Sequence, residues 1–292
     1  MTAEKGNPSR RQFLRQCGAG LSSGALAGAG LMGETTASAD GTGKTLKTPV
    51  IDGHAHAGTA SAMTDPWTCM ADPEAILRRN QEAGIDQSVI FPINHDTFEE
   101  ANREIAQICR RFPGKFIGYA KHDPLHEKGR IRSMLFHECR ELGLRGLKLH
   151  VHPGPEVLDA VAELGIPILY HPERVSQFEE IASAYPMVDF ILAHLGSDQS
   201  IDWREHVAAI ALAKKFPNIY LDTGATVFSR FIEQAVREVG PEKVLFGSDE
   251  PEVDCRQEIF KIRVLKLPKA QEELILGGNL LRLLSKYKGG VN

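Results

Sequence analysis

Two histidines, His54 and His56, follow a short apolar run and are separated by one residue. On an extended segment, side chains two positions apart point to the same face, so both imidazoles can reach one point in space. Neutral imidazoles that converge in this way are typical ligands of a metal ion. The alternative is a solvated turn after a buried strand, and the pair alone does not decide between the two. The metal interpretation therefore requires further ligands elsewhere in the chain.

The histidine pair opens a repeating pattern. From Pro49 onward, a short apolar run, a polar loop and an amphipathic helix recur in the same order. The apolar runs predict strands at residues 49–52, 88–93, 116–120, 146–150, 167–171, 188–194, 218–222 and 243–247. The helical patterns predict helices at residues 72–84, 98–112, 129–142, 155–164, 175–185, 203–216 and 227–239, and closing helices over 257–286. Because the strands are almost continuously apolar, we expect a parallel sheet that is buried on both faces.

Eight such units in about 250 residues are the size of a closed (β/α)8 TIM barrel, an α/β fold with right-handed crossovers. The alternative is an open doubly wound sheet. That fold usually carries a Gly-rich phosphate turn after its first strand, where this chain carries His54 and His56. We therefore predict a single barrel domain over residues 49–286, followed by a loose C-terminus at 287–292.

Three more polar residues are predicted at the mouth formed by the C-terminal strand ends. His171 ends the fifth predicted strand, His194 ends the sixth, and Asp249 follows the eighth. The first and eighth strands are neighbours in a closed barrel, so Asp249 should lie beside the histidine pair. Singly, His171 could cap a strand and Asp249 could serve a turn. Together, imidazoles and a carboxylate at one mouth suit zinc or a similar divalent metal, with a position left for water.

Basic side chains are predicted around the same mouth. Lys148 alternates with leucines on the fourth strand, so it should point into the barrel. It could bind a substrate carboxylate, reach solvent at the rim, or become a carboxylated bridge between two metals. Asp222 faces inward on the seventh strand and is expected at most to support a ligand. The candidate substrate-binding residues are Lys148, His150, Lys121 and Arg174.

At these residues the chain resembles the amidohydrolase superfamily. The similarity lies in the Ile-Asp-Gly-His-Ala-His opening at 51–56, in His171 and His194, and in the Gly-Ser-Asp ending at 247–249. The Gly-Gly-Asn-Leu-Leu-Arg-Leu-Leu segment at 277–284 resembles the amidohydrolase-2 branch, which includes aminocarboxymuconate-semialdehyde decarboxylase-like proteins. The resemblance implies that His194 is a catalytic acid/base or a ligand of a second metal. The metal ligands that it implies are His54, His56, His171 and Asp249.

The family includes hydrolases, decarboxylases and hydratases, so three functions are considered. The first is a metal-dependent hydrolase, with Zn²⁺ as the expected metal, that attacks an amide, lactone or ester of a small molecule with activated water. Asp249 or His194 would move the proton. The second is a non-oxidative decarboxylase of a cyclic or unsaturated carboxylate. The third is an exported metal- or solute-binding protein without catalytic activity.

The N-terminal segment predicts export. A paired arginine at Arg10 and Arg11 precedes a Gly/Ala-rich apolar stretch at 17–33 and an Ala-Ser-Ala site that ends at Ala39. This order of features is typical of a twin-arginine signal at residues 1–39, read by the twin-arginine translocation machinery and followed by a linker at 40–48. A disordered basic tail is the alternative. The apolar stretch is too short for a stable membrane span, and we expect a periplasmic protein.

Composition narrows the range of partners. The predicted signal has a net charge of +2, so its removal takes the formal charge of the chain from −4 to −6. No basic stripe remains, and a nucleic-acid partner is not expected. Outside the predicted signal, which contains Cys17, four cysteines lie far apart without a Cys-x-x-Cys pair. They are Cys69, Cys109, Cys139 and Cys255, and their spacing argues against a sulfur-ligated metal.

Overall fold

The computed structural model describes residues 47–59, 71–93, 97–197 and 202–288. The predicted export signal, most of the linker, Cys69 and the last four residues lie outside the described residues. The described residues from Lys47 onward belong to one compact unit. Within these ranges no helix has both the length and the apolar character needed to cross a membrane.

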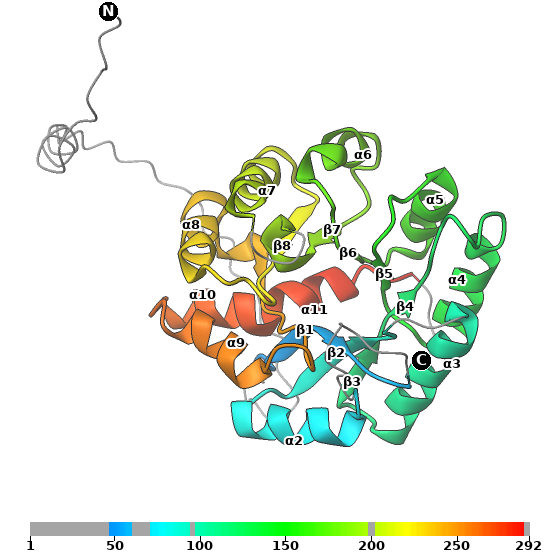
Figure 1. The fold of residues 1–292 in the computed structure, drawn as a ribbon, viewed down its shortest axis with the longest axis horizontal. Coiled ribbons are helices and arrows are strands. Elements are labelled where there is room, and N and C mark those ends of the chain that lie inside the picture. The colour runs from blue at the N-terminus through cyan, green and yellow to red at the C-terminus, as the bar shows by residue number, and fades with distance from the viewer. Residues whose placement is uncertain (1–46, 60–70, 94–96, 198–201, 289–292) are drawn as a thin grey trace, which may run out of the picture. The chain divides into compact units, whose positions relative to one another are not determined.

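Parallel strands form the centre of the unit, inside a ring of helices (Figure 1). In the described ranges they are β1 (Ile51–His56), β2 (Gln87–Phe91), β3 (Phe116–Gly118), β4 (Ala120–Lys121), β5 (Leu147–Leu149), β6 (Ile168–Tyr170), β7 (Phe190–Leu192), β8 (Ile219–Asp222) and β9 (Val244–Leu245). The expected strand at 116–120 is divided at Tyr119, because its ladder changes partner there. Gly118 pairs with β2, whereas Ala120 pairs with β5.

The strand series closes on itself through backbone hydrogen bonds. Gly53 N–H donates to the carbonyl of Phe246 at 2.9 Å, and Asp249 N–H donates to the carbonyl of His54 at 2.7 Å. His56 N–H donates to the carbonyl of Glu250 at 2.7 Å, beside a parallel bridge between Ala55 and Glu250. These bonds join β1 to the segment that follows β9. The predicted (β/α)8 barrel is confirmed.

The helices begin and end where local sequence signals place them. At α2, the side chain of Asp72 accepts hydrogen bonds from two backbone amides of the first turn, Pro73 is the first helical residue, and Gly84 ends the helix in the left-handed region. The other helices of the ring are α3 (Phe98–Arg111), α4 (Ile131–Arg140), α5 (Pro155–Leu164), α6 (Phe178–Ala184), α7 (Trp203–Lys215), α8 (Ser229–Val239) and α9 (Cys255–Arg263). The ring covers the outer face of the strands.

The closing helical stretch is divided into α9, α10 (Lys269–Glu273) and α11 (Asn279–Leu284), with a π-helical turn at Leu274–Gly278 before α11. Gly277 lies in that turn, where a Cβ would overlap the backbone carbonyl of Pro49. The chain therefore crosses close beneath the start of β1, which a continuous helix with ordinary side chains could not do. The short helices at Val175–Gln177, Ala193–Gly196 and Pro241–Lys243 complete these connections.

Two apolar layers stabilise the barrel. The larger one packs the ring helices against the outward side chains of the strands. The smaller one fills the barrel interior with inward side chains such as Val89, Tyr119 and Ile191, and Leu280 and Leu283 of α11 join it. Leu280 lies beside Gly53, and Ile51 lies beside Gly277, so α11 closes the N-terminal end of the barrel. The opposite, C-terminal end carries the polar residues.

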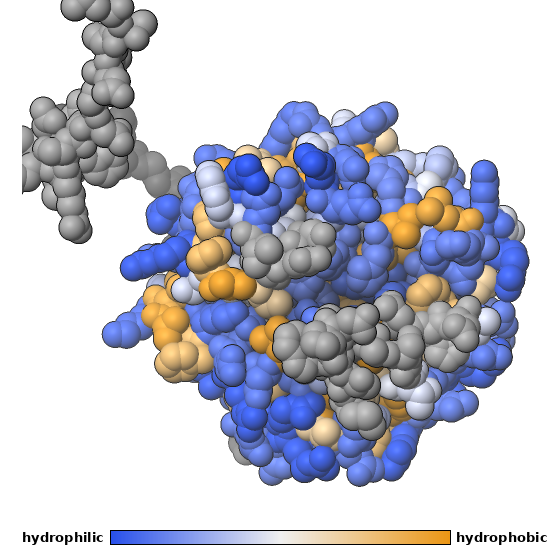
Figure 2. Space-filling model, in the orientation of Figure 1, coloured by the Kyte–Doolittle hydropathy of each residue, from blue (hydrophilic) through white to orange (hydrophobic). Residues whose placement is uncertain are grey.

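The surface is mainly hydrophilic, as expected when most apolar side chains are buried. Figure 2 shows one face on which hydrophilic side chains dominate and hydrophobic ones lie in small separate areas. Large exposed hydrophobic residues in the described part include Leu125, Met187, Trp203, Val227 and Phe260. Single exposed hydrophobic residues are normal for soluble domains.

The contribution of α11, which closes the N-terminal end of the barrel, to stability can be tested. Leu283 is fully buried, whereas Leu281 on the same helix is 38% exposed. We expect Leu283→Ala to lower the free energy of unfolding by about 2–5 kcal/mol, because it leaves a cavity in the barrel interior. Leu281→Ala should change it by no more than about 0.5 kcal/mol. Urea denaturation of both variants measures this, and equal losses would show that α11 does not close the barrel.

Candidate metal centre and active site

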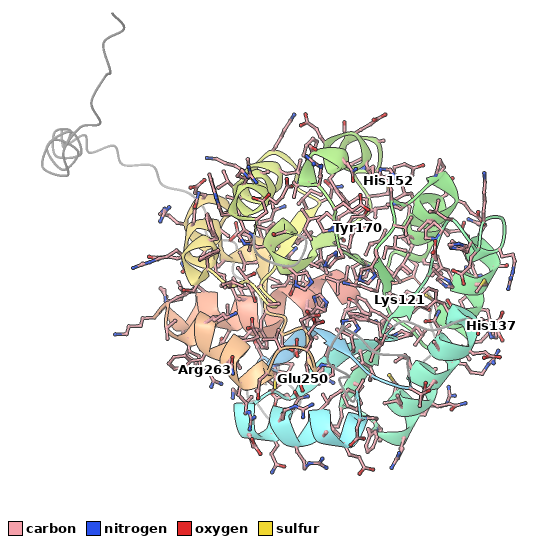
Figure 3. All side chains as sticks on the ribbon, viewed as in Figure 1. Lys121, His137, His152, Tyr170, Glu250 and Arg263 are labelled. Carbon is pink, nitrogen blue, oxygen red and sulfur yellow. The ribbon has the colours of Figure 1, made fainter. Side chains whose placement is uncertain are left out.

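A pocket with a volume of about 120 Å³ lies at the C-terminal mouth of the barrel. Its lining residues are His54, His56, Ile93, Lys121, Lys148, His150, His171, His194, Asp249 and Glu252. The structure therefore brings together all the candidate site residues except Arg174, which is exposed on the loop after β6 and is not part of the lining. Figure 3 shows Lys121 and Glu250 toward the middle of the ring, whereas His137 and Arg263 lie at its periphery.

The compact donor group of the pocket consists of His54, His56 and Asp249. Asp249 Oδ1 lies 3.1 Å from His54 Nε2 and 3.2 Å from His56 Nε2, and all three side chains are largely buried. Burial raises the pKa of Asp249, but the nearby imidazoles of His194 and His54 outweigh it, so this pKa lies well below its usual value. Burial lowers the pKa of His56 to about 4. At neutral pH the group therefore combines a carboxylate with a neutral imidazole.

The protonation of His54 gives a test of whether a metal fits. Burial and Lys148 oppose a proton on this imidazole, but Asp222 and Asp249 outweigh them and raise its pKa. The Nδ1 atom already faces Asp222 at 2.8 Å, so the extra proton belongs on Nε2, toward Asp249. A metal ion replaces a ligand proton of this kind. The nitrogen and oxygen donors therefore fit a divalent cation.

Asp222 orients His54. Its Oδ2 accepts the hydrogen bond from His54 Nδ1 and a second one from the backbone N–H of His194 at 3.2 Å. A Cβ at Gly247 would overlap Asp222, so the glycine allows the segment after β9 to approach the end of β8. His54, His194 and Asp222 also form a compact group, but in it Asp222 is already bonded to Nδ1 of His54. The geometry is that of a carboxylate that supports a histidine ligand.

A second carboxylate holds the two strand ends that carry the donors. Asp52 is fully buried and accepts hydrogen bonds from Ser248 Oγ at 2.5 Å and Ser248 N–H at 2.9 Å. It also accepts one from His54 N–H at 3.1 Å. Burial raises the pKa of Asp52 to about 7. Asp52 and Ser248 both belong to the sequence motifs. The sequence does not indicate that they are bonded to each other, because 196 residues separate them.

His194 lies beside the donor group as a neutral imidazole. Burial lowers its pKa, and its Nδ1–H donates to the carbonyl of Gly224 at 2.9 Å. The Nε2 atom is therefore the acceptor. The ring centroid lies 4.9 Å from that of His54 and 4.8 Å from that of His171. His171 lines the pocket without joining the compact three-residue group, so its ligand role stays a prediction.

Two lysines face the same pocket. Lys148 is fully buried, with its Nζ 3.4 Å from His54 Nε2 and 5.2 Å from the ring centre of Phe91. The alternative that its tip reaches solvent at the rim is therefore wrong, because the side chain is fully buried. Burial lowers the pKa of Lys148 to about 8 and that of Lys121 to about 7. Both amines can therefore gain or lose a proton near neutral pH.

A buried polar network lies behind Lys121. The side-chain amide of Asn102 on α3 bonds to Glu138 on α4 at 2.8 Å. Glu138 also bonds to His122 Nε2 at 2.8 Å, and His122 Nδ1 bonds to Glu127 at 2.9 Å. Burial disfavours the charged imidazole, but the two glutamates raise the pKa of His122 to about 9. His122 is therefore a buried cation that links α4 to the loop after β4.

Glu252 is a pocket residue that the sequence analysis missed. Its backbone N–H donates to the carbonyl of Asp249 at 3.0 Å, so a turn returns the chain to the mouth. Burial and the charge of Asp249 raise the pKa of this carboxyl. The signal in the sequence is the acidic run from Asp249 to Glu252, which is interrupted by Pro251.

A closed parallel barrel with imidazole and carboxylate donors at its C-terminal mouth defines a class of barrel enzymes with a divalent metal centre. The amidohydrolase family model matches residues 51–286. The chain therefore belongs to the amidohydrolase family. No curated protein matches the sequence of this chain.

Several solved structures share the fold of this chain. A Pseudomonas putida protein, provisionally named 2-pyrone-4,6-dicarboxylic acid hydrolase, has a TM-score of 0.65 and 18% identity, over 82% of this chain and 99% of its own. A Polaromonas dihydroxybenzoic acid decarboxylase with bound manganese and 2-nitroresorcinol has a TM-score of 0.63 and 16% identity, over 82% and 97%. A Sphingomonas paucimobilis 5-carboxyvanillate decarboxylase has a TM-score of 0.62 and 15% identity, over 82% and 99%. The TM-scores and the coverage establish a shared fold.

The support that Asp222 gives to His54 can be tested by substitution. We expect Asp222→Asn to weaken divalent metal binding by about 10- to 100-fold, because a neutral amide accepts a weaker hydrogen bond from His54 Nδ1 than a carboxylate does. Asp202→Asn, at the exposed N-terminal cap of α7, is the matched control and should leave the affinity unchanged. Titration of metal-free protein with a fluorescent zinc competitor measures both. Unchanged affinity in Asp222→Asn would contradict the assigned role.

The buried His122 cation predicts a dependence of stability on pH. Its pKa is about 9 when folded and about 6.5 when unfolded. Its contribution to stability is therefore complete below about pH 6.5 and is lost as the pH rises through 9. We expect the free energy of unfolding to fall by roughly 1–3 kcal/mol across this range, and His122→Gln to remove that dependence. Urea denaturation at several pH values decides this, and a variant that keeps the full slope would refute it.

Proposed function

We propose that the protein is a metal-dependent hydrolase that cleaves an amide, lactone or ester bond of a small molecule. The observation that carries this proposal is the convergence of His54 Nε2 and His56 Nε2 on Asp249 Oδ1 at 3.1 and 3.2 Å, in a buried pocket at the barrel mouth. Such an enzyme needs an ionised carboxylate and imidazoles that are neutral or whose extra proton a metal ion can replace. Membership of the amidohydrolase family supports the same reaction class.

We propose Zn²⁺ as the metal, held by His54, His56 and Asp249, with His171 as the fourth ligand. Zinc prefers sets of imidazole and carboxylate donors. When bound, a divalent metal lowers the pKa of water toward about 7 and polarises a carbonyl. The Polaromonas decarboxylase contains manganese, so the metal content of this protein has to be measured directly. A second metal would require a carboxylated Lys148, and we rank that below a role of Lys148 in substrate binding.

Asp249 and His194 are the two side chains that we propose for proton transfer. Asp249 is ionised at neutral pH, so it can accept the proton of an attacking water. His194 presents an unprotonated Nε2 beside the donor group, because its Nδ1–H is committed to Gly224. We propose that Asp249 takes the first proton and that His194 assists its passage to the leaving group. Asp222 keeps His54 in the tautomer that leaves Nε2 for the metal.

A non-oxidative decarboxylase is the second candidate. The observation that favours it is the pair of buried amines, Lys121 and Lys148, which can anchor a carboxylate in the same pocket. Two of the three structural neighbours described above bear decarboxylase names. The chemistry of the product separates the candidates, because hydrolysis releases an acid with an alcohol or amine, whereas decarboxylation releases carbon dioxide.

The His54→Ala/His56→Ala double variant tests the metal-dependent function. We expect it to lose bound metal and turnover together, because two of the three compact donors are removed. Elemental analysis of protein purified without added metal should be combined with a screen of lactones, amides and cyclic carboxylates, with carbon dioxide measured separately. His126→Ala, at a side chain that is 82% exposed, is the control and should keep both.

A double variant that loses the metal but keeps full turnover would refute the proposed mechanism. Release of carbon dioxide together with the decarboxylated substrate, without any hydrolysis product, would favour the decarboxylase. A fully metallated protein without turnover in the whole screen would favour the non-enzymatic binding protein.

A further inference from the structure

We propose that Lys121 is the residue that selects an anionic group on the substrate, and that Asn102 is a positioning residue that holds it in place. The substrate class is therefore a small molecule that carries a carboxylate in addition to the bond that reacts. This inference rests on the proposed function for the reaction, but it concerns ligand binding and can be tested without turnover.

Besides its pairing with Lys148 of β5, the main chain of Lys121 is held by the side chain of Asn102. Asn102 Oδ1 accepts from Lys121 N–H at 2.9 Å, and Asn102 Nδ2 donates to the carbonyl of Lys121 at 3.1 Å. This pair of bonds reproduces what a strand partner would supply. It is needed because β4 has only two residues, and the strand ladder changes partner one residue before it. Asn102 thus fixes the backbone from which the ammonium group projects.

Asn102 is itself fixed by buried charges. Its amide donates to Glu138, and Glu138 is bonded to the cationic His122. Asn102, Glu138 and His122 are each no more than 2% exposed. A buried network whose members are all bonded holds one geometry, because any rearrangement leaves a charge without a partner. The network borders the pocket through Lys121, which directly precedes His122 in the chain.

The same helix also contacts the end of the Lys121 side chain. Phe98 and Asn102 are one turn apart on α3, so they lie on one helical face. The Nζ atom of Lys121 lies 5.4 Å from the ring centre of Phe98 and 3.4 Å from the carbonyl of Ile93. Helix α3 therefore positions both the backbone and the ammonium group of this lysine. Its side chain is only 4% exposed and lines the pocket.

The two lysines of the pocket have different surroundings. The amine of Lys148 lies beside the metal donors, 3.4 Å from His54 Nε2, and its charge is stabilised by Asp249 and Asp222. Lys121 lies on the neighbouring strand, where burial and the charge of Lys148 act against its own charge and Asp249 favours it. An anion placed between the two amines would remove this repulsion and form charge-assisted hydrogen bonds. The geometry therefore favours a substrate whose carboxylate is held by Lys121 while its reacting bond lies near the candidate metal donors.

Paired probes of equal shape test this selection. Benzoate and benzamide differ in charge but little in size, and their binding to the metal-loaded protein can be measured by calorimetry or by competition. We expect Lys121→Met to weaken benzoate binding by about 10- to 100-fold and to leave benzamide binding and metal content unchanged. Lys121→Arg should recover part of the benzoate affinity. Lys128→Met, at an exposed lysine on the loop before α4, is the matched control and should change neither probe.

The positioning role of Asn102 has its own variant. Asn102→Ala should weaken benzoate binding by about 3- to 10-fold, with benzamide binding and metal content again unchanged. If Asn102→Ala does not fold, Phe98→Leu tests the same helix face, because it removes the ring beside the ammonium group and keeps an apolar side chain. It should also lower the preference for benzoate.

Two results would overturn the inference. The first is a benzoate affinity that Lys121→Met leaves unchanged, which would mean that the metal or Lys148 binds the anion. The second is an equal loss of both probes in the Asn102 or Phe98 variant, which would assign these residues a purely structural role. A charge-selective pocket in a protein without hydrolase activity would support the inference and refute the proposed function, so the two failures are distinguishable.

Discussion

The junction between β1 and the segment after β9 is the constraint on which the site depends. His56 and Asp249 are 193 residues apart in the chain, yet they meet because backbone hydrogen bonds close the barrel there. The buried bonds from Ser248 to Asp52 tie the two segments together directly beside the donors. The metal donors are therefore not grouped by a local loop. They are grouped by the last step of barrel formation, and they should exist as a site only in the closed fold.

This arrangement explains the electrostatics of the pocket. Closing the barrel removes water from carboxylates, imidazoles and lysines at once, and each charge then depends strongly on its neighbours. Asp249 stays ionised because imidazoles surround it, whereas His56 is kept neutral by burial. The same burial lowers the pKa of both lysines toward neutrality. One geometric event thus sets the charge states of the carboxylates, imidazoles and amines at the barrel mouth.

The sequence contains enough to predict the barrel and most of the pocket. Strand periodicity places His54, His171 and Asp249 at strand ends, and parallel closure brings strand ends together wherever they lie in the chain. Arg174 is an exception, because a residue beyond a strand end follows the loop path, which strand periodicity does not specify. The division at Tyr119 is another, because the ladder changes partner there through contacts with strands on both sides. Those contacts are not local in sequence.

The network behind Lys121 escapes sequence analysis for a different reason. Asn102 and Glu138 lie on helices, where polar residues normally indicate an exposed face, and only their mutual bonding makes burial favourable. The pocket is therefore built in two independent ways. The metal side is held by the closure of β1 onto the segment after β9, and the lysine side is held by α3 and α4. Because these supports share no residue, substitutions on α3 and α4 could change which anion is accepted without disturbing the metal donors. A barrel of this kind can keep one metal centre while its substrate changes, which is consistent with the different reactions named for proteins that share its fold.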